Sequence, residues 1–411
     1  MTKKFYELSP ADRVKALSLS PVLEQRFLDQ QNLYHQDLVE NYLTDFSLPE
    51  GMVKDAVVDG QKYQVPLVTE EPSVIAAANN GMRLFRMKGG VKSGEPSHAL
   101  LGGQIIFNQI KWDELSEFVE NHRGEIEEQA QLAKPSLYAR GGGIRSINLR
   151  KVPGNRASLD LTVETGLAMG ANAVNTILEA VKTIFVPYAE QILAAILTNA
   201  GHDSVVTVRG QVPVDSLGGL DIAKKIVALS DFAKVDTDRA VTENKGIFNG
   251  LSAVVLALGN DWRAVEAAGH AYAARQGLYQ SLSTWQLSAD EKTLLGELSL
   301  PLNIGLVGGG LAGLQQAQDN FKLLGQPTVD EVKKVILAIG LSSNLAALKA
   351  ITSQGIQAGH MRMQARTLAI QVGARPDEVQ WVAERLVAAV RIDEQTAKEI
   401  LGDLRNHEPK A

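Results

Sequence analysis

The chain has 411 residues, of which 45% are hydrophobic and 21% charged, and it contains no cysteine. This length exceeds what one hydrophobic core usually organises, so two or three domains are expected. A net charge of −6 argues against a protein that coats nucleic acid or an anionic membrane, because either role needs a basic face. The missing cysteines exclude disulfides, thiolate metal sites and a cysteine nucleophile, and they suit a reducing cytoplasm.

The N-terminal segment predicts a helix that begins after Ser9. Ser9 can cap the helix, Pro10 suits its first turn, and Asp12 favours the positive end of the helix dipole. Helical sequence then continues toward Asn41. No apolar run of signal-peptide length is present here, and no later run approaches the roughly 18 residues of a membrane-spanning helix. We therefore expect a soluble, cytoplasmic protein.

From Ala56 the pattern changes from helix to strand. The run AVVDGQKYQVPLV predicts a β-hairpin, because two β-rich stretches flank an Asp59-Gly60 turn. Pro72 is then placed to open a helix. Residues 87 to 98 are rich in glycine, serine and lysine and precede a fresh strand, so they predict a domain boundary.

The next stretch predicts a small domain of mixed helix and strand, inserted into a larger one. A charged helix, interrupted near Gly124, ends by Pro135; two strands and the helix NAVNTILEAVKTIF follow. The chain is expected to return to the first domain near residue 212. The fold class expected is thus α+β, without a classical Rossmann unit. The expected domains are residues 1–96 with 213–350, residues 97–212, and a helical tail of residues 351–411.

The stretch ENKGIFNGLSAVVLALGND sets Lys245 and Asp261 sixteen residues apart around an uncharged segment. Burying a charge at each end of so apolar a run is costly unless the charge is paired, so a protein that keeps both is expected to use them. Lysines and aspartates beside glycines are as often solvated loop residues, and Asn-Asp-Trp is also typical of a helix cap. These residues alone leave both interpretations open.

The segments TENKGIFNG and ALGNDWRAVEAAGHAYAAR resemble the soluble bacterial (class II) hydroxymethylglutaryl-coenzyme A reductases. The resemblance continues, in the family's order, through ENYLTDFSLP, VPLVTEEPSVIAAAN, AMGANAVNT, LVGG, IGLSSNLAALKA and GIQAGHM. It implies an inserted cofactor-binding domain, a mobile C-terminal flap and an active site built across a dimer interface. The implied reaction is the NAD(P)H-dependent reduction of hydroxymethylglutaryl-coenzyme A to mevalonate and coenzyme A, or its reverse.

The resemblance implies four catalytic residues, and each suits its role chemically. Lys245 is expected to stabilise the oxyanion that develops on the carbonyl. Glu71 matches the family's catalytic glutamate and can donate a proton, although without the family pattern it could not be told from its neighbour Glu70, and such pairs are more often exposed turns. Asp261 is expected to form a hydrogen-bonded network with Lys245 and Glu71. His360 matches the histidine that protonates the coenzyme A thiolate, because imidazole titrates near neutral pH.

The substrate's free carboxylate and hydroxyl are expected to meet a second group of polar residues. Arginine binds a carboxylate with two donors, which is the reason to expect Arg239 in that role. The other matching positions are Ser73, Asn249 and Asn344. Histidines and carboxylates lack the spacing of a metal site, so no metal is expected.

Two glycine motifs compete for the dinucleotide cofactor. GGGLAG at 308–313 fits GxGxxG, but no clean βαβ unit surrounds it, and the resemblance places this loop near the active site. AMGAN at 168–172 matches the family's nucleotide-binding segment, where glycine allows close approach and a helix N-terminus favours phosphate. The cofactor-binding residues expected are Met169, Gly170, Ala171, Asn172 and Arg145.

The chain departs from the family pattern at several of these positions. Leu167 stands where relatives usually carry an acidic residue, and Ser146 ends a GGGxRD-like segment without its carboxylate. Losing both carboxylates removes repulsion of a 2′-phosphate and predicts a preference for NADPH over NADH. Glu243 stands where the family often carries histidine, and Leu314-Gln315 replace a His-Pro pair.

Two other functions stay open on the sequence. One is a different NAD(P)-dependent oxidoreductase, acting on another acyl-coenzyme A or a hydroxy acid with the same scaffold. The other is a noncatalytic coenzyme A-binding protein, which the filled catalytic positions argue against.

Overall fold

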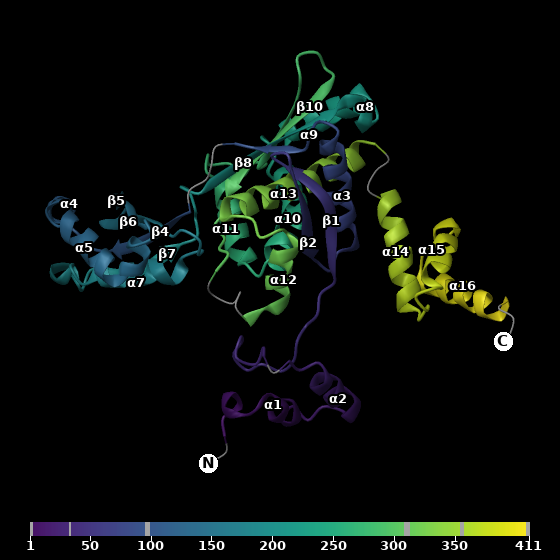
Figure 1. Cartoon of the computed structure of the whole chain (residues 1–411), viewed down its shortest axis with the longest axis horizontal. Coiled ribbons are helices and arrows are strands. Elements are labelled where there is room, and N and C mark those ends of the chain that lie inside the picture. The colour runs from purple at the N-terminus through teal and green to yellow at the C-terminus, as the bar shows by residue number, and fades with distance from the viewer. Residues whose placement is uncertain (1–2, 33, 95–98, 308–312, 354–356, 408–411) are drawn as a thin grey trace.

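The computed structural model describes residues 3–32, 34–94, 99–307, 313–353 and 357–407, with only the backbone at 357–360, 362, 363 and 407. The fold is α+β, as expected. A central body holds one sheet and most of the long helices, and a lobe built on a second sheet lies to one side (Figure 1). A helical tail lies on the opposite side of the central body, and the N-terminal helices lie below the central body in this view.

The central sheet has six strands in the order β2-β1-β3-β8-β10-β9. β1 (Glu50–Val58) and β2 (Gln61–Val68) form the expected hairpin. Asp59 and Gly60 have φ values of 51° and 85°, the positive pair that a two-residue type I′ turn requires. The other strands are β3 (Val91–Ser93), β8 (Val205–Pro213), β9 (Ser283–Leu287) and β10 (Thr293–Pro301).

No parallel βαβ unit precedes the glycines that follow β10 in the described chain. β10 pairs antiparallel with both β8 and β9, and the one parallel pairing in this sheet joins β1 to β3. This agrees with rejecting a Rossmann interpretation of GGGLAG, since that fingerprint opens a helix after a parallel strand. Residues 308–312 of the motif lie outside the described residues.

The second sheet has four antiparallel strands in the order β5-β6-β4-β7. Its strands are β4 (Leu100–Phe107), β5 (Gly143–Val152), β6 (Arg156–Glu164) and β7 (Ile192–Thr198). Its helices are α4 (Trp112–Asn121), α5 (Arg123–Ala133), α6 (Pro135–Tyr138) and α7 (Ala171–Lys182), and a short 3₁₀ turn spans Val186–Tyr188. The helix interruption expected near Gly124 lies at His122, between α4 and α5.

The chain leaves this lobe earlier than the expected boundary at residue 212. Residues 205–212 belong to β8, which pairs with β3 and β10 in the central sheet. The cause is hydrophobic alternation, because Val206, Val208 and Val212 all point into the central core. Ser204, just before β8, forms two hydrogen bonds with the backbone of Leu100 at the start of β4. Its hydroxyl donates to the Leu100 carbonyl at 2.6 Å and accepts from the Leu100 N–H at 3.0 Å. This joins the incoming and outgoing segments.

Helix α13 (Val329–Thr352) lies in the centre of the body and corrects one expectation. By length and composition it is apolar enough to span a membrane, so the expectation that no run approaches that length is wrong. In its most apolar 18-residue window, 78% of the residues are buried inside the protein, as in the core helix of a globular domain. The other helices of the body are α3 (Pro72–Arg86), α8 (Val214–Leu217), α9 (Leu220–Phe232), α10 (Thr237–Ala257), α11 (Trp262–Ala273) and α12 (Gln315–Leu323).

The N-terminal segment is separate from the sheet core, although the expected first domain includes it. Ser9 caps α1 (Pro10–Ala16) as predicted, accepting from the Asp12 N–H at 3.2 Å. The helix does not continue toward Asn41, because Pro21 starts a second helix, α2 (Pro21–Asp29), after a break. A 3₁₀ turn, Phe5–Glu7, precedes α1.

The tail consists of α14 (Gln357–Gln371), α15 (Val379–Ala388) and α16 (Glu394–His407), and it has apolar clusters of its own. Glu378 ties these helices together. Its carboxylate accepts from Arg405 at 2.8 Å and from Arg375 at 2.9 Å. The hydrogen bond from Arg405, followed by that from the Arg375 backbone, lowers the pKa of Glu378 to about 2.

Helices α3, α10 and α13 cross at close range because two glycines allow it. A Cβ at Gly81 of α3 would overlap the Ser342 carbonyl oxygen of α13, and one at Gly250 of α10 would overlap the Ser343 hydroxyl. The overlap at Gly81 is with backbone and requires backbone movement, whereas the overlap at Gly250 is with a side chain that would have to rotate away. The two glycines therefore set the spacing of the three helices.

Replacing Gly81 by alanine should destabilise the protein by about 1–3 kcal/mol, because the methyl group forces α3 away from the α13 backbone. Gly124→Ala is the matched control, since Gly124 is also helical but a Cβ there meets nothing within 4 Å. That variant should be neutral or gain up to about 1 kcal/mol. Thermal unfolding measures both, and equal melting temperatures for the two variants would contradict the role of the crossing.

Candidate active site

A cavity of about 330 Å³ lies where α3, α10 and α13 meet. Six of the predicted site residues line it: Glu71 and Ser73 at the start of α3, Arg239, Lys245 and Asn249 on α10, and Asn344 on α13. Lys245 and Asn249 share a face of α10 because they are four residues apart, whereas Arg239 lies about 120° away around the helix. The structure thus brings together the predicted substrate-binding residues and two of the four predicted catalytic ones.

Glu71 and Lys245 form the hydrogen-bonded pair of this cavity. The Lys245 ammonium donates to Oε2 of Glu71 at 3.0 Å, and the Ser73 hydroxyl donates to Oε1 at 2.8 Å. The side chain of Lys245 is 62% exposed and that of Glu71 32%, so the lysine charge is paired but not buried. An exposed pair contributes little to stability. The pair places an ammonium group and a carboxyl group side by side at the mouth of the cavity.

Asp261 lies elsewhere in this chain, at the N-terminus of α11. Its Oδ1 accepts from the backbone N–H groups of Arg263 at 3.0 Å and Ala264 at 3.1 Å, which confirms the capping interpretation. Helix α10 continues for about 18 Å beyond Lys245 before it ends at Ala257, at about 1.5 Å per residue. One chain therefore does not assemble the expected network of Asp261 with Lys245.

His360 lies on the first turn of α14, and its side chain is outside the described residues. The backbone places it in the tail, and α14 approaches α3, the helix that Glu71 precedes. The tail is therefore next to the helix that carries the cavity mouth.

The inner end of the cavity is buried and polar. Oδ1 of Asn344 accepts from the Trp285 indole at 2.7 Å and from the Ser283 hydroxyl at 3.0 Å, so this oxygen is held by the core. Beside it lies Glu243, whose side chain is 0% exposed. Sequence reasoning noted Glu243 only as a departure from the family pattern. Its position one helical turn after Arg239 is the signal that could have placed it in the cavity.

Burial raises the pKa of Glu243, and four neighbours oppose that shift. The largest opposing effect is the charge of Arg239, whose Nε lies 3.7 Å from Oε2 of Glu243. Smaller effects come from the Ser283 and Ser281 hydroxyls and the Asn344 amide. A buried carboxyl group with one nearby cation is thus part of the site.

The predicted nucleotide segment lies at the N-terminus of α7. Gly170 has a φ of 95° and caps the helix, and the first turn has no acidic residue. The N–H groups at such a terminus favour an anion. Met169, Ala171 and Asn172 flank this glycine, as expected. This segment also joins the central body, because the Leu306 N–H donates to the Leu167 carbonyl at 2.9 Å.

The remaining predicted cofactor residue, Arg145 on β5, is engaged with other groups. Its Nε lies 2.8 Å from Oε2 of Glu164, and it also donates to the Gly141 carbonyl. A carboxylate thus remains near the nucleotide segment, paired with a cation, despite the loss of acidic residues at Leu167 and Ser146. Leu167 itself is 61% exposed.

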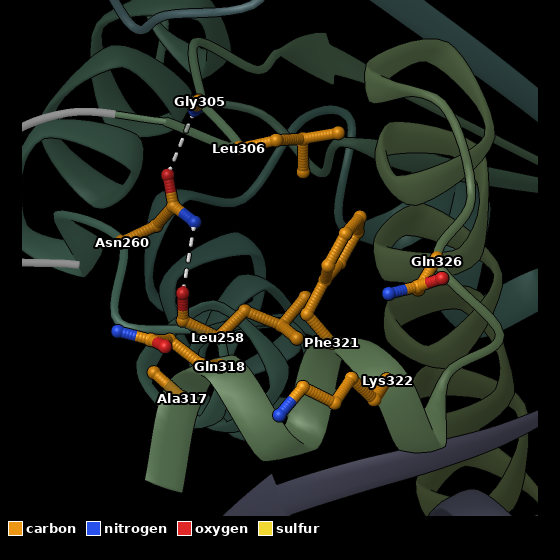
Figure 2. A pocket seen from close by; sticks show the side chains of 9 residues that line it. All are labelled: Leu258, Asn260, Gly305, Leu306, Ala317, Gln318, Phe321, Lys322 and Gln326. Atoms are coloured by element: carbon orange, nitrogen blue, oxygen red, sulfur yellow. Dashed lines mark hydrogen bonds between the residues drawn. The ribbon is translucent and has the colours of Figure 1, made fainter. Parts of the chain in front are cut away.

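A second cavity, of about 230 Å³, lies between α12 and residues 305–306 (Figure 2). Figure 2 shows Asn260 at its edge, accepting from the Gly305 N–H at 2.8 Å and donating to the Leu258 carbonyl at 3.2 Å. Gly305 and Leu306 lead directly to the contact with Leu167. The start of α11, with Asp261, is thereby joined to the nucleotide segment rather than to the cavity of Lys245.

Comparison with known proteins identifies the family. The family model described as hydroxymethylglutaryl-coenzyme A reductase matches residues 11–365. A reductase of this kind from Archaeoglobus fulgidus is 36% identical over 98% of this chain and 94% of its own length. The chain belongs to the hydroxymethylglutaryl-coenzyme A reductase family.

Solved structures of reductases agree with this assignment. The hydroxymethylglutaryl-coenzyme A reductase of Streptococcus pneumoniae is 38% identical, with a TM-score of 0.76 over 98% of this chain and 99% of that one. A further structure of that class II reductase is bound to NADPH in open conformations. It matches with the same identity and TM-score, over 97% of this chain and 100% of that one. Of the functions considered from the sequence, NAD(P)H-dependent reduction of hydroxymethylglutaryl-coenzyme A is the one confirmed.

Proposed function

We propose that the cavity between α3, α10 and α13 holds the acyl group of hydroxymethylglutaryl-coenzyme A during its reduction to mevalonate. The observation that carries this proposal is the 3.0 Å bond between Lys245 and Glu71 at the mouth of a cavity with Arg239 inside. A thioester carbonyl beside the Lys245 ammonium would leave the free carboxylate directed inward to Arg239. Ser73 and Asn249 line the path between these two ends.

In this proposal the residues of the chain stabilise charge and move protons. Lys245 holds the carbonyl oxygen while negative charge develops on it. The bound nicotinamide supplies the hydride. His360 protonates the departing thiolate, and Glu71, oriented by Ser73, donates a proton toward the carbonyl oxygen in the second reduction. The tail, residues 351–411, is proposed to act as the flap that brings His360 to the site.

Lys245→Ala tests the central assignment. Turnover with hydroxymethylglutaryl-coenzyme A should fall about 100- to 1000-fold, because the developing oxyanion loses its cation. Lys224→Ala is the matched control, since Lys224 also pairs with a glutamate on the surface, at 3.1 Å from Glu291. Substrate-dependent oxidation of NADPH measures both. Near-normal turnover of the Lys245 variant would refute its role.

The site is proposed to be completed by a second copy of the chain. In one chain Asp261 lies beyond the far end of α10, so the network of Lys245, Glu71 and an aspartate needs the partner subunit's Asp261. Apolar surface next to the cavity supports this, because Val241, one turn before Lys245 on α10, is 49% exposed and Val235 is 73% exposed. The N-terminal segment also exposes Tyr34 and Phe46, at 90% and 88%.

Mixing two inactive variants tests this shared site. Lys245→Ala and Asp261→Asn proteins, unfolded and refolded together, should regain about a quarter of the wild-type activity, because half of the dimers are mixed and each has one intact site. Each variant refolded alone is the control. No recovery on mixing, with dimers present by light scattering, would show that each site belongs to one chain.

The start of α7 is proposed to bind the pyrophosphate of the cofactor, with NADPH preferred over NADH. The helix terminus fits a dinucleotide, because Gly170 brings the backbone close and no acidic side chain occupies the first turn. The exposed Leu167 and the pairing of Glu164 with Arg145 leave little unpaired negative charge beside a 2′-phosphate. A cytoplasmic location, where both cofactors occur, is part of the same proposal.

Leu167→Asp tests the cofactor preference. The ratio of kcat/KM for NADPH to that for NADH should fall about tenfold, because the new carboxylate repels the 2′-phosphate. Leu193→Asp, at an equally exposed leucine on β7 of the same lobe, should leave the ratio unchanged. A wild-type enzyme that uses NADH as well as NADPH would refute the preference itself.

A further inference from the structure

Three buried polar atoms without hydrogen-bond partners meet in the site cavity. They are Nε of Arg239, Oε2 of Glu243 and Oγ of Ser343. In the described part of the chain, the one further atom of this kind is in Thr44, in the N-terminal segment. Buried polar groups in folded proteins nearly always have partners. Their concentration in one cavity marks the place where a polar group of a ligand completes the bonding.

The two carboxyl oxygens of Glu243 have different surroundings. Oε1 accepts from the Ser281 hydroxyl at 3.2 Å, and the Ser283 hydroxyl lies at the same distance but shares its one proton between Oε1 and Oδ1 of Asn344. Oε2 has no such donor, and its 3.7 Å separation from Nε of Arg239 is too long for a hydrogen bond. Arg239 and Glu243 are thus adjacent but not hydrogen-bonded to each other, and each has one buried polar atom without a partner beside the cavity.

The neighbours of Glu243 favour its neutral form. Burial raises the pKa of this carboxyl group. Strand β9 and helix α13 pack against it with neutral groups, namely Ser283 and Asn344. The charged groups that line the cavity in the described chain are Arg239, Lys245 and Glu71. Lys245 and Glu71 pair with each other at the mouth, so Arg239 is the cation that faces Glu243.

We propose that Glu243 and Arg239 together bind the free carboxylate of an acyl thioester. Arg239 supplies the positive charge, and the protonated Oε2 of Glu243 donates a hydrogen bond. This rests on the proposed function, in which the acyl group occupies this cavity. A carboxylate is acceptor only, so it can use donors from both residues at once. The ligand class selected is a thioester with a terminal carboxylate, and Glu243 is a specificity residue for it.

The proposal makes binding depend on pH in a defined direction. When Glu243 loses its proton, two carboxylates face each other in a buried space and repel. The dissociation constant of a carboxylate-bearing thioester should therefore rise with pH, by up to about tenfold per unit above the pKa of Glu243. A thioester in which a methyl group replaces the terminal carboxylate lacks this interaction, so its binding should not show the added slope.

Calorimetric titration without nicotinamide tests this, with hydroxymethylglutaryl-coenzyme A and its methyl-terminated analogue from about pH 6 to about pH 9. The ratio of the two dissociation constants cancels the titration of the coenzyme A phosphates. In the wild type, the dissociation constant of the analogue divided by that of hydroxymethylglutaryl-coenzyme A should fall toward one as pH rises. In Glu243→Gln, which keeps a donor but cannot ionise, it should stay constant. Asp238→Asn, an exposed carboxyl on the same helix, should behave as the wild type.

A wild-type ratio that does not change with pH overturns the inference, and so does a slope that persists in Glu243→Gln. If that variant fails to fold, the wild-type protein still decides the question. Titrations in two buffers of different ionisation enthalpy should then show proton uptake when hydroxymethylglutaryl-coenzyme A binds, and none when the methyl-terminated analogue binds. Failure of the proposed function is a separate outcome, seen as no NADPH oxidation with hydroxymethylglutaryl-coenzyme A at any pH.

Discussion

The close crossing of α3, α10 and α13 is the constraint on which the site depends. Gly81 and Gly250 let the three helix backbones approach, and each helix contributes one part of the cavity. Helix α3 supplies an acid at its N-terminus, α10 supplies both cations, and α13 supplies the buried amide of Asn344. Widening any crossing would separate Lys245 from Glu71, because their bond spans two of these helices.

Local features of the fold could be predicted from the sequence. The Asp59-Gly60 hairpin, the Ser9 cap and the helix opened by Pro72 each depend on a few adjacent residues with strong backbone preferences. Features set by distant pairing could not. Residues 205–212 were assigned to the inserted domain, but they belong to β8, whose place in the central sheet depends on β3 and β10, far away in sequence.

The candidate site shows the same division. Lys245 and Asn249 are four residues apart on α10, a spacing that places both on one face of a helix, and both line the cavity. The resemblance implies that Asp261 joins a network with Lys245, but about 18 Å of helix separates the two within one chain. Glu243 shows the reverse error, since a residue noted only for its identity proves to be fully buried beside Arg239.

The tail, proposed above as the flap of the site, is a unit with apolar packing of its own. Its three helices bury their apolar residues against one another, and the charges of Arg375 and Arg405 converge on Glu378 within the same unit. Displacing such a unit breaks its contacts with the central body but leaves its internal packing intact. In the proposed function, moving this flap would cost the free energy of the contacts between the tail and the central body, such as those of α14 with α3.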